Sequence, residues 1–322
     1  MPYKIVVKEA GGTDQLARVE IDCPEPAAGE ILIRQTAVGL NFIDIYQRTG
    51  LYPVPPNFVA GGEAAGVIEA VGPDVTLKVG TRVAYVIAGG GAYSSHRVVP
   101  EASVVVLPDG ISDEIGAAVM LKGLTVNYLI THSYPVSRGD TVLVHAAAGG
   151  VGLIAGQWLK AMGVTAIGTA GGATKCALAR AHGYAHVIDY RSEDFVARVM
   201  EITGGEGVPA VYDSVGADTV MRSLDVLQRF GTLVSFGQSS GPSKEFTIND
   251  LTRGSLRLTR PTLFHHTAKP GWMAQAASSL FDLIESGAIK ITISGRYALS
   301  EVGQAQDALE ARQTTGSTIL IP

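Results

Sequence analysis

The chain has 322 residues, of which 46% are hydrophobic and 17% are charged, a composition typical of a folded globular protein and not of a disordered one. A net charge of −5, from 25 basic and 30 acidic residues, argues against nucleic acid or an anionic membrane as a dedicated partner. The length predicts two domains.

The first residues show no secretory signal, and no stretch is apolar for long enough to span a membrane. The two cysteines, Cys23 and Cys176, are far apart and match no metal-ligand spacing. We interpret them as free thiols, and we expect a cytoplasmic protein.

Short β-type runs alternate with Gly and Pro over the first third of the chain, which predicts a β-rich, barrel-like domain. These runs are residues 4–7, 31–39, 64–72, 82–87, 93–99 and 103–107. One polar passage interrupts them, GLNFIDIYQRTGLYPVPP at residues 39–56, in which we expect a short helix followed by a proline-rich loop. Ser112 is a candidate N-cap for a helix that runs to Leu129 and connects to a second domain.

Residues 141–162, TVLVHAAAGGVGLIAGQWLKAM, are the most informative stretch. Four residues of a buried strand precede a turn of small residues, and apolar positions at helical spacing follow it. Ala147, Gly149 and Gly152 stand where the dinucleotide-binding pattern G-x-G-x-x-G has its glycines, with Ala in the first place. Bare backbone N–H groups at a helix N-terminus can bind a pyrophosphate, and Gly152 lets the helix pack closely. Ala147 is compatible with this if its φ is negative.

Strands and helices then alternate, which predicts a doubly wound parallel sheet and an α/β fold. We expect strands at 164–170, 186–190, 209–215, 231–237 and 255–260, and helices at 174–183, 192–204 and 217–231. After residue 270 we expect helices at 272–287 and 300–313 and strands at 289–294 and 317–322, which return to the first domain. The predicted domains are residues 1–124 with 265–322, and residues 125–264. A cleft between them, at the carboxyl ends of the parallel strands, is the expected functional site.

The loop after the second strand of this sheet predicts a preference for NADPH over NADH. NAD-selective sites carry an acid about 20 residues beyond the glycine turn, whereas here the sequence reads Thr169 to Lys175 with no acid before Asp189. Lys175 supplies a cation, and Tyr190 and Arg191 could add a hydroxyl and a charge for the 2′-phosphate. The alternative for Lys175 is a solvated lysine at a helix start.

The chain resembles the quinone oxidoreductase and zeta-crystallin branch of the medium-chain dehydrogenases/reductases. The residues that carry the resemblance are Gly139-Asp140, Leu143, Ala147 to Gly150, Gly152, Gln157 and Lys160, with further matches at residues 39–53, 61–68, 121–129, 212–216 and 235–241. The resemblance spans the chain. It implies a GroES-like first domain, completed by the C-terminal segment, a Rossmann second domain, and NADPH-dependent reduction of quinones.

Zinc ligands of the wider superfamily are missing. The ligand motif G-H-E reads Gly61-Gly62-Glu63, no cysteine lies near Asn41, and no C-x-x-C cluster is present. Because four-coordinate zinc needs three or four such ligands, we expect no metal. The substrate must then be electrophilic by itself, as a quinone or a conjugated enone is.

The resemblance, together with the polar passage, points to Tyr46 as a hydrogen-bond donor to the substrate, with Asn41 and Tyr52 lining the same pocket. A phenol with a pKa of about 10 suits a donor better than an efficient acid, so solvent could deliver the proton. The alternatives are a core tyrosine for Tyr46 and a turn or cofactor-amide contact for Asn41.

Cofactor contacts carried over from the family pattern lie in both predicted domains. Beside the nicotinamide half they are Phe42, Ile43, Asp44, Ile45, Tyr46 and Tyr128, and at the pyrophosphate they are Gly149, Gly150 and Val151. Around the adenosine phosphate they are Gly171, Gly172, Ala173, Thr174, Lys175, Tyr190 and Arg312, the last of which could instead be a surface residue. At later strand ends they are Ser214, Val215, Phe236, Gly237, Gln238, Ser239, Pro261, Thr262 and Leu263. Phe264, His265 and His266 resemble a variable pocket wall.

The leading hypothesis is therefore a zinc-independent NADPH:quinone oxidoreductase. One alternative is an NADPH-dependent reductase of enone or alkenal double bonds. Another, from a different class, is an NADPH-binding protein with a structural or RNA-binding role, against which the acidic charge speaks. The SLRLTRPTL segment, at the expected sheet edge, could pair with its twin in a homodimer.

Overall fold

A computed structural model describes residues 1–322 and divides them into two compact units. Unit 1 contains Met1–Leu124, Thr267–Glu285 and Ile291–Pro322, and unit 2 contains Thr125–His266 and Ser286–Lys290. No helix is long and apolar enough to span a membrane.

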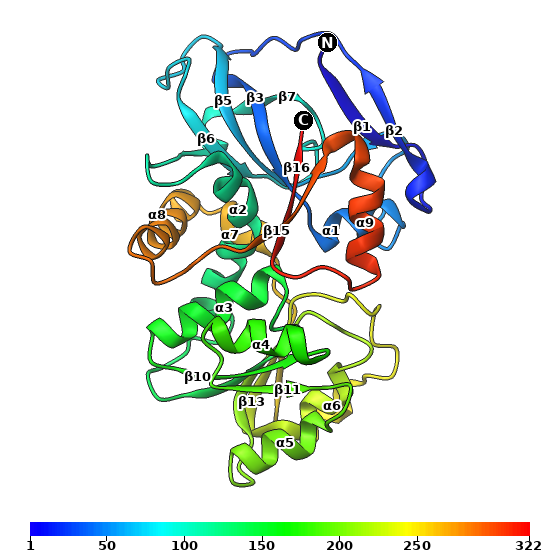
Figure 1. The fold of residues 1–322 in the computed structure, drawn as a ribbon, viewed down its shortest axis with the longest axis vertical. Coiled ribbons are helices and arrows are strands. Elements are labelled where there is room, and N and C mark those ends of the chain that lie inside the picture. Colours follow the sequence, from blue (N-terminus) through cyan, green and yellow to red (C-terminus); the bar gives the residue numbers. More distant parts are fainter. The chain divides into compact units, whose positions relative to one another are not determined.

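Unit 2 is built on a six-stranded parallel sheet with the strand order β11-β10-β9-β12-β13-β14 (Figure 1). The strands are β9 (Thr141–Val144), β10 (Thr165–Ala170), β11 (His186–Asp189), β12 (Val208–Asp213), β13 (Leu227–Ser235) and β14 (Arg257–Thr259). The helices are α3 (Gly150–Ala161), α4 (Ala173–Ala181), α5 (Phe195–Ile202), α6 (Val220–Ser223) and α7 (Leu263–Thr267). Numbered from β9, the strand order is 3-2-1-4-5-6, which is that of a dinucleotide-binding sheet. The predicted Rossmann fold is confirmed.

Unit 1 is β-rich, and its larger sheet has the order β15-β16-β3-β5-β6-β8 with β7 paired to β3. The strands of this sheet are β3 (Glu30–Gly39), β5 (Glu63–Val71), β6 (Arg82–Val86), β7 (His96–Pro100), β8 (Val104–Val106), β15 (Ile293–Ala298) and β16 (Ser317–Ile321). A smaller sheet contains β1 (Tyr3–Val7), β2 (Leu16–Glu20) and β4 (Phe58–Val59). The final strand β16 pairs with β3 and so extends the sheet of this β-rich unit. This β-rich architecture confirms the predicted GroES-like first domain.

Four helices accompany these sheets: α1 (Phe42–Arg48), α2 (Asp113–Tyr128), α8 (Trp272–Glu285) and α9 (Val302–Glu310). Figure 1 shows α1 and α9 side by side, where the Arg48 Nε donates a hydrogen bond to Gln306 Oε1 at 2.6 Å. Helix α2 starts after Ser112, whose Oγ accepts from the Ile115 N–H at 3.2 Å, as expected of an N-cap. A π-helical turn, Leu129–Ser133, continues α2.

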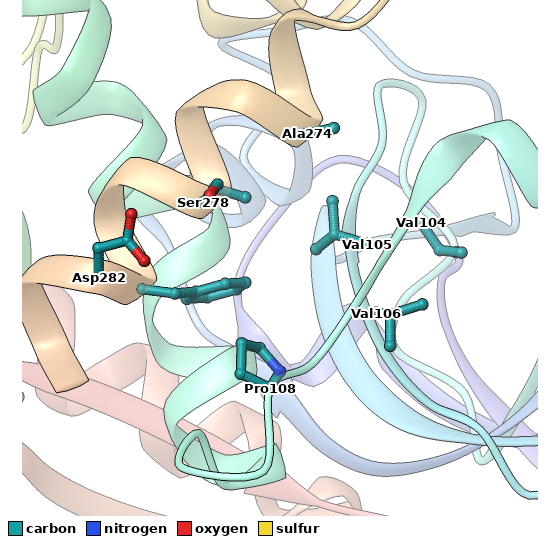
Figure 2. Close-up of a pocket in the computed structure, with 9 residues that line it drawn as sticks. Val104, Val105, Val106, Pro108, Ala274, Ser278 and Asp282 are labelled. Carbon is teal, nitrogen blue, oxygen red and sulfur yellow. The ribbon is translucent and has the colours of Figure 1, made fainter.

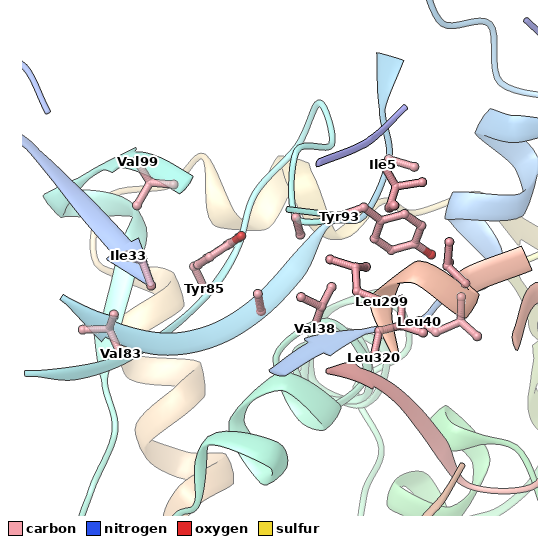
Figure 3. Packing of buried hydrophobic residues seen from close by; sticks show 14 of the residues in the cluster. Ile5, Ile33, Val38, Leu40, Val83, Tyr85, Tyr93, Val99, Leu299 and Leu320 are labelled. Carbon is pink, nitrogen blue, oxygen red and sulfur yellow. The ribbon is translucent and has the colours of Figure 1, made fainter. Parts of the chain in front are cut away.

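Each unit has its own apolar core. In unit 1, Ile33, Val38, Val83 and Leu320 pack around the inward-facing rings of Tyr85 and Tyr93 (Figure 3). In unit 2, Leu143, Ile167, Val211 and Leu233 come from adjacent parallel strands and are fully buried, which explains why β9 reads as a continuous apolar run.

Two predicted elements are wrong. The predicted helix 217–231 is reduced to α6, followed by a 3₁₀ turn, and Leu227 already begins β13. Pairing with β12 along a shifted register takes these residues into the sheet. The predicted strand 289–294 lies four residues further on, as β15, because pairing with β16 starts only at Ile293.

Candidate functional site

The turn after β9 leaves the N-terminus of α3 bare. Ala147 is not among the residues with positive φ, so an alanine is compatible with the first position of the dinucleotide-binding pattern. Its neighbour Ala146 adopts φ 55°. Gly149 is the N-cap of α3. A Cβ on Gly152 would lie 2.7 Å from the carbonyl carbon and oxygen of Ala147, so only glycine fits there. The first N–H groups of α3 therefore face no side chain of the turn, as anion binding requires.

In the loop after β10, which is predicted to bind the adenosine phosphate, hydrogen-bond donors lie around two glycines. A Cβ on Gly171 would lie 2.5 Å from the Tyr190 hydroxyl and 3.2 Å from Arg191 Nε, and one on Gly172 would lie 3.4 Å from Arg191 Nη1. Lys175 follows in the first turn of α4. Asp189 Oδ1 accepts from the N–H groups of Gly172 at 2.9 Å and Arg191 at 3.1 Å. Asp189 is thus bound to the backbone, and it lies at the end of β11, not of β10.

The ends of β12 and β13 are held together at the same edge of the sheet. The fully buried Asp213 accepts from the N–H groups of Val215 at 2.7 Å and Gly216 at 3.1 Å. Phe236 N–H donates to the Asp213 carbonyl, and Ser239 N–H to the Ser214 carbonyl. These contacts bring the predicted residues Ser214, Val215 and Phe236 to Ser239 together.

The end of β14 joins this edge through Arg260, whose Nη1 donates to the carbonyls of Ser235 at 3.1 Å and Gly237 at 2.8 Å. Pro261, Thr262 and Leu263 follow it, and Leu263 begins α7. In unit 2, the strand ends thus carry the predicted pyrophosphate and adenosine residues on one edge of one sheet.

Tyr128 lies at the end of α2 and is 2% exposed. Its ring stacks on His266 with centroids 4.6 Å apart, and His132 meets His266 edge-on at 5.2 Å. Burial raises the pKa of the Tyr128 hydroxyl, which therefore stays protonated at neutral pH. The predicted wall residue His266 thus contacts a predicted nicotinamide-side residue.

In unit 1, helix α1 carries the predicted substrate residues. Asn41 is its N-cap, and Asp44 closes a capping box by accepting the Asn41 N–H at 2.9 Å. Tyr46 packs edge-on against Tyr52 with centroids 5.2 Å apart, and Phe42 lies 6.1 Å from Tyr46. The structure therefore brings the predicted catalytic residues into one polar and aromatic segment.

Asp44 faces inward and is fully buried. Its Oδ2 also accepts from the Tyr93 hydroxyl at 2.9 Å, while Oδ1 has no hydrogen-bond partner. Burial raises the pKa of Asp44 to about 7, Glu63 adds to the shift, and Lys122 and the two hydrogen bonds oppose it. Helix α1 therefore carries a buried carboxyl group whose pKa lies near neutral pH.

Glu63 is also fully buried, where the sequence has G-G-E in place of a zinc-ligand motif. Its Oε1 accepts from Lys122 Nζ at 2.9 Å and from Asn41 Nδ2 at 2.7 Å, and its Oε2 accepts from the Leu121 N–H at 2.5 Å. No group of three or more His, Cys, Asp or Glu side chains is placed to hold a metal ion. Lys122 thus forms a buried ion pair with this carboxylate.

Arg312 follows α9 in unit 1, is exposed and adopts φ 55°. Unit 1 also has a groove of about 330 Å³ between β8 and α8, lined by the valines of β8, Pro108, Phe281, Ser278 and Asp282 among others (Figure 2). None of the predicted site residues lines this groove, so it has no part in the site described here.

Lys122 and His145 are among the buried polar residues that were not predicted. Lys122 interrupts an apolar helical run, and that interruption is a signal for a paired charge. His145 directly follows the apolar strand β9, and its Nδ1 lies 2.9 Å from Thr169 Oγ1 while its Nε2 lies 2.9 Å from Ser223 Oγ. Burial lowers the pKa of His145, so a neutral imidazole links β9, β10 and α6 beside the glycine turn.

Two family models match the chain. One, described as the alcohol dehydrogenase GroES-like domain, covers residues 27–109, and the other, described as zinc-binding dehydrogenase, covers residues 150–278. A quinone oxidoreductase of Pseudomonas aeruginosa is 49% identical, with both chains covered completely. A 2-haloacrylate reductase of a Burkholderia species is 39% identical over 100% of this chain and 99% of the relative. The crystal structure of Escherichia coli quinone oxidoreductase complexed with NADPH matches with a TM-score of 0.97 and 46% identity, covering 99% of this chain and 100% of the other.

Proposed function

Because the chain belongs to the quinone oxidoreductase family of the medium-chain dehydrogenases/reductases, we propose that it reduces quinones with NADPH and without zinc. NADPH supplies a hydride from C4 of its nicotinamide, and a proton from solvent or from a donor completes the hydroquinone. The protein binds and orients the two reactants, and this positioning supplies much of the rate enhancement.

The observation that carries the cofactor proposal is the loop after β10. Gly171 and Gly172 lie open to the Tyr190 hydroxyl and the Arg191 guanidinium, Lys175 follows, and the end of β10 has no acid. A 2′-phosphate would gain charge-assisted hydrogen bonds there, whereas an acid would repel it. The bare N-terminus of α3 suits the pyrophosphate. The similar Escherichia coli enzyme is described as complexed with NADPH, in agreement with this assignment.

What supports zinc independence is the set of donor groups around Asn41. Asn41 and Gly62 are not zinc ligands, and the Glu63 carboxylate is bound by Lys122, Asn41 and a backbone N–H. Without a Lewis acid the reducible carbonyl must rely on its own electrophilicity and on hydrogen-bond donors. Tyr46, Tyr52 and Asn41 are the donors that we assign to this role.

A second candidate substrate class is the conjugated enones, because a 2-haloacrylate reductase is 39% identical along the whole chain. Hydride addition to an enone also places negative charge on a carbonyl oxygen, so the same donors would serve. Steady-state NADPH oxidation with a graded quinone panel and a graded enone panel separates the two classes. Metal analysis of the same sample tests zinc independence: stoichiometric zinc, or turnover that a chelator abolishes, would refute it.

We further propose a homodimer formed through β14, with a cytoplasmic location following from the two free thiols. β14 is at the edge of the parallel sheet, and its Leu258 is 36% exposed. Phe230, which is 63% exposed, lies on the neighbouring strand β13. An unpaired edge with exposed apolar side chains is suited to pairing with a second copy.

A further inference from the structure

The side-chain amide of Asn41 is fixed in one orientation by its neighbours. Its Nδ2 lies 2.7 Å from Glu63 Oε1, and a carboxylate can only accept, so the NH₂ end of the amide must face Glu63. The backbone N–H of Asn41 is bound in turn by Asp44 Oδ2 at 2.9 Å, which holds this residue at the start of α1. A flipped amide would set its oxygen against the Glu63 carboxylate and is therefore excluded.

Glu63 is itself immobile. Lys122, Leu121 and Asn41 all donate to it, and it is 0% exposed. A Cβ on Gly39, at the end of β3, would collide with Glu63 Oε1 and with the carbonyl of Ala117, so the carboxylate fills the space that this glycine leaves. The orientation of Asn41 therefore depends on a buried ion pair that has little room to move.

We propose that Glu63 and Lys122 are a positioning pair, which holds the Asn41 amide so that its second N–H is directed to the carbonyl oxygen of the substrate. The inference rests on the proposed function and deepens it. Nδ2 carries two hydrogens, of which Glu63 takes one. The other meets the oxygen on which negative charge develops when hydride arrives, and a fixed donor at that point lowers the barrier.

The charge of Lys122 explains how a buried carboxylate is tolerated so close to a developing anion. The Lys122 ammonium, 2.9 Å from Glu63 Oε1, makes the pair neutral. Asn41 can thus be oriented by a charged acceptor without repulsion between that acceptor and the substrate oxygen. Removing Lys122 alone would leave an uncompensated buried charge, so the pair must be replaced together.

A double-mutant cycle tests the positioning role. Glu63→Leu with Lys122→Met replaces the pair by apolar side chains, and Asn41→Ala removes the donor. With 1,4-benzoquinone and NADPH, we expect the pair replacement to lower kcat about 10- to 100-fold, the range for one hydrogen bond to a developing anion. In the Asn41→Ala background the same replacement should change kcat less than about twofold, because the pair acts only through Asn41.

Two further measurements separate positioning from loss of structure. The Kd for NADPH, from its fluorescence, should change less than about twofold when the pair is replaced, since neither Lys122 nor Glu63 is among the residues assigned to the cofactor. Glu101→Gln is a matched control, because Glu101 also accepts two backbone N–H groups but is only partly buried and bonds Thr76 and Leu77, not the Asn41 network, and it should keep wild-type kcat. If the pair variant does not fold, Glu63→Gln replaces it in the same cycle. We then expect Glu63→Gln to lower kcat at least about fivefold in the protein that retains Asn41, and not in the Asn41→Ala variant.

Additive losses in the two backgrounds, or a rise in the Kd for NADPH that matches the loss of kcat, would overturn the positioning role and leave the proposed function intact. Absence of NADPH oxidation by the wild-type protein with both quinones and enones would instead refute the proposed function, and the positioning role with it.

Discussion

Replacing the buried Asp44 by Asn should make the stability of the protein less dependent on pH. Folding raises the pKa of Asp44 from its ordinary value of 3.8 to about 7, chiefly by burial. The folded state therefore binds the proton more tightly than the unfolded state does. The stabilisation that results is complete below pH 3.8, and it is lost as the pH rises through 7.

The magnitude follows from the two pKa values. One pKa unit corresponds to about 1.4 kcal/mol, and linkage between pH 5 and pH 8 gives a loss of about 2.5 kcal/mol from this one group. Asn cannot ionise, so the stability of Asp44→Asn does not fall with rising pH in this way. Its amide nitrogen would replace the unpartnered Oδ1, which lowers stability by an amount that does not vary with pH. For a domain of 150 to 250 residues, 2.5 kcal/mol corresponds to about 5 to 10 °C in Tm.

Thermal unfolding of both proteins at pH 5 and pH 8, at one ionic strength, measures the effect. We expect the Tm of Asp44→Asn minus that of the wild type to rise by about 5 to 10 °C between the two pH values. Asp250→Asn is the control, because Asp250 closes a capping box with Thr247 while hydrogen bonds to Thr247 keep its pKa below the ordinary range. Its Tm difference should be the same at both pH values. A pH-independent difference for Asp44→Asn as well would refute the assigned titration.

Three further predictions concern the close approach to Glu63, the cofactor phosphate and the dimer. Gly39→Ala should lower stability by about 1 to 3 kcal/mol, because the new methyl group collides with Glu63 and with a backbone carbonyl. Gly62→Ala, whose Cβ would lie 3.6 Å from its nearest neighbour, should change Tm by no more than about 2 °C, and equal losses for the two glycines would contradict the packing argument. Lys175→Ala and Arg191→Ala should each reduce the NADPH-over-NADH ratio of kcat/KM roughly tenfold with little effect on NADH, and an unchanged ratio in both would count against the phosphate site. Leu258→Lys should convert the proposed dimer to a monomer in light scattering, and a wild-type protein that is already monomeric would refute the proposed interface.

Local patterns predicted most of the parallel sheet, because its strands are buried on both faces and the turn after β9 needs small residues whatever the rest of the chain does. The same rules failed for Leu227–Gly231, where helical spacing continues but pairing with β12 and a positive φ at Phe230 place the residues in β13. They also failed for β15, whose start is set by its pairing with β16.

In the site around Asn41, too, contacts within one turn can be predicted from the sequence, and contacts between distant residues cannot. A capping box is readable in Asn41 and Asp44, since both partners lie within one turn. The pairing of Lys122 with Glu63 joins residues 59 apart in the chain, and nothing near either residue indicates the other. The sequence could show that zinc ligands are missing, but only the fold shows which group occupies the neighbourhood of the carboxylate.

The pairing of β16 with β3 has a consequence for synthesis on the ribosome. β3 is complete once Gly39 has been translated. Its C-terminal end, Val38 and Gly39, pairs with Leu320 and Ile319 of β16, which are translated almost last. Arg48 on α1 waits equally long for Gln306 and Glu310 of α9. The nascent first unit must therefore persist with an open strand edge, and with an Arg48 guanidinium that lacks its α9 partners, while the second unit emerges and folds. That interval is when chaperones have the most to shield.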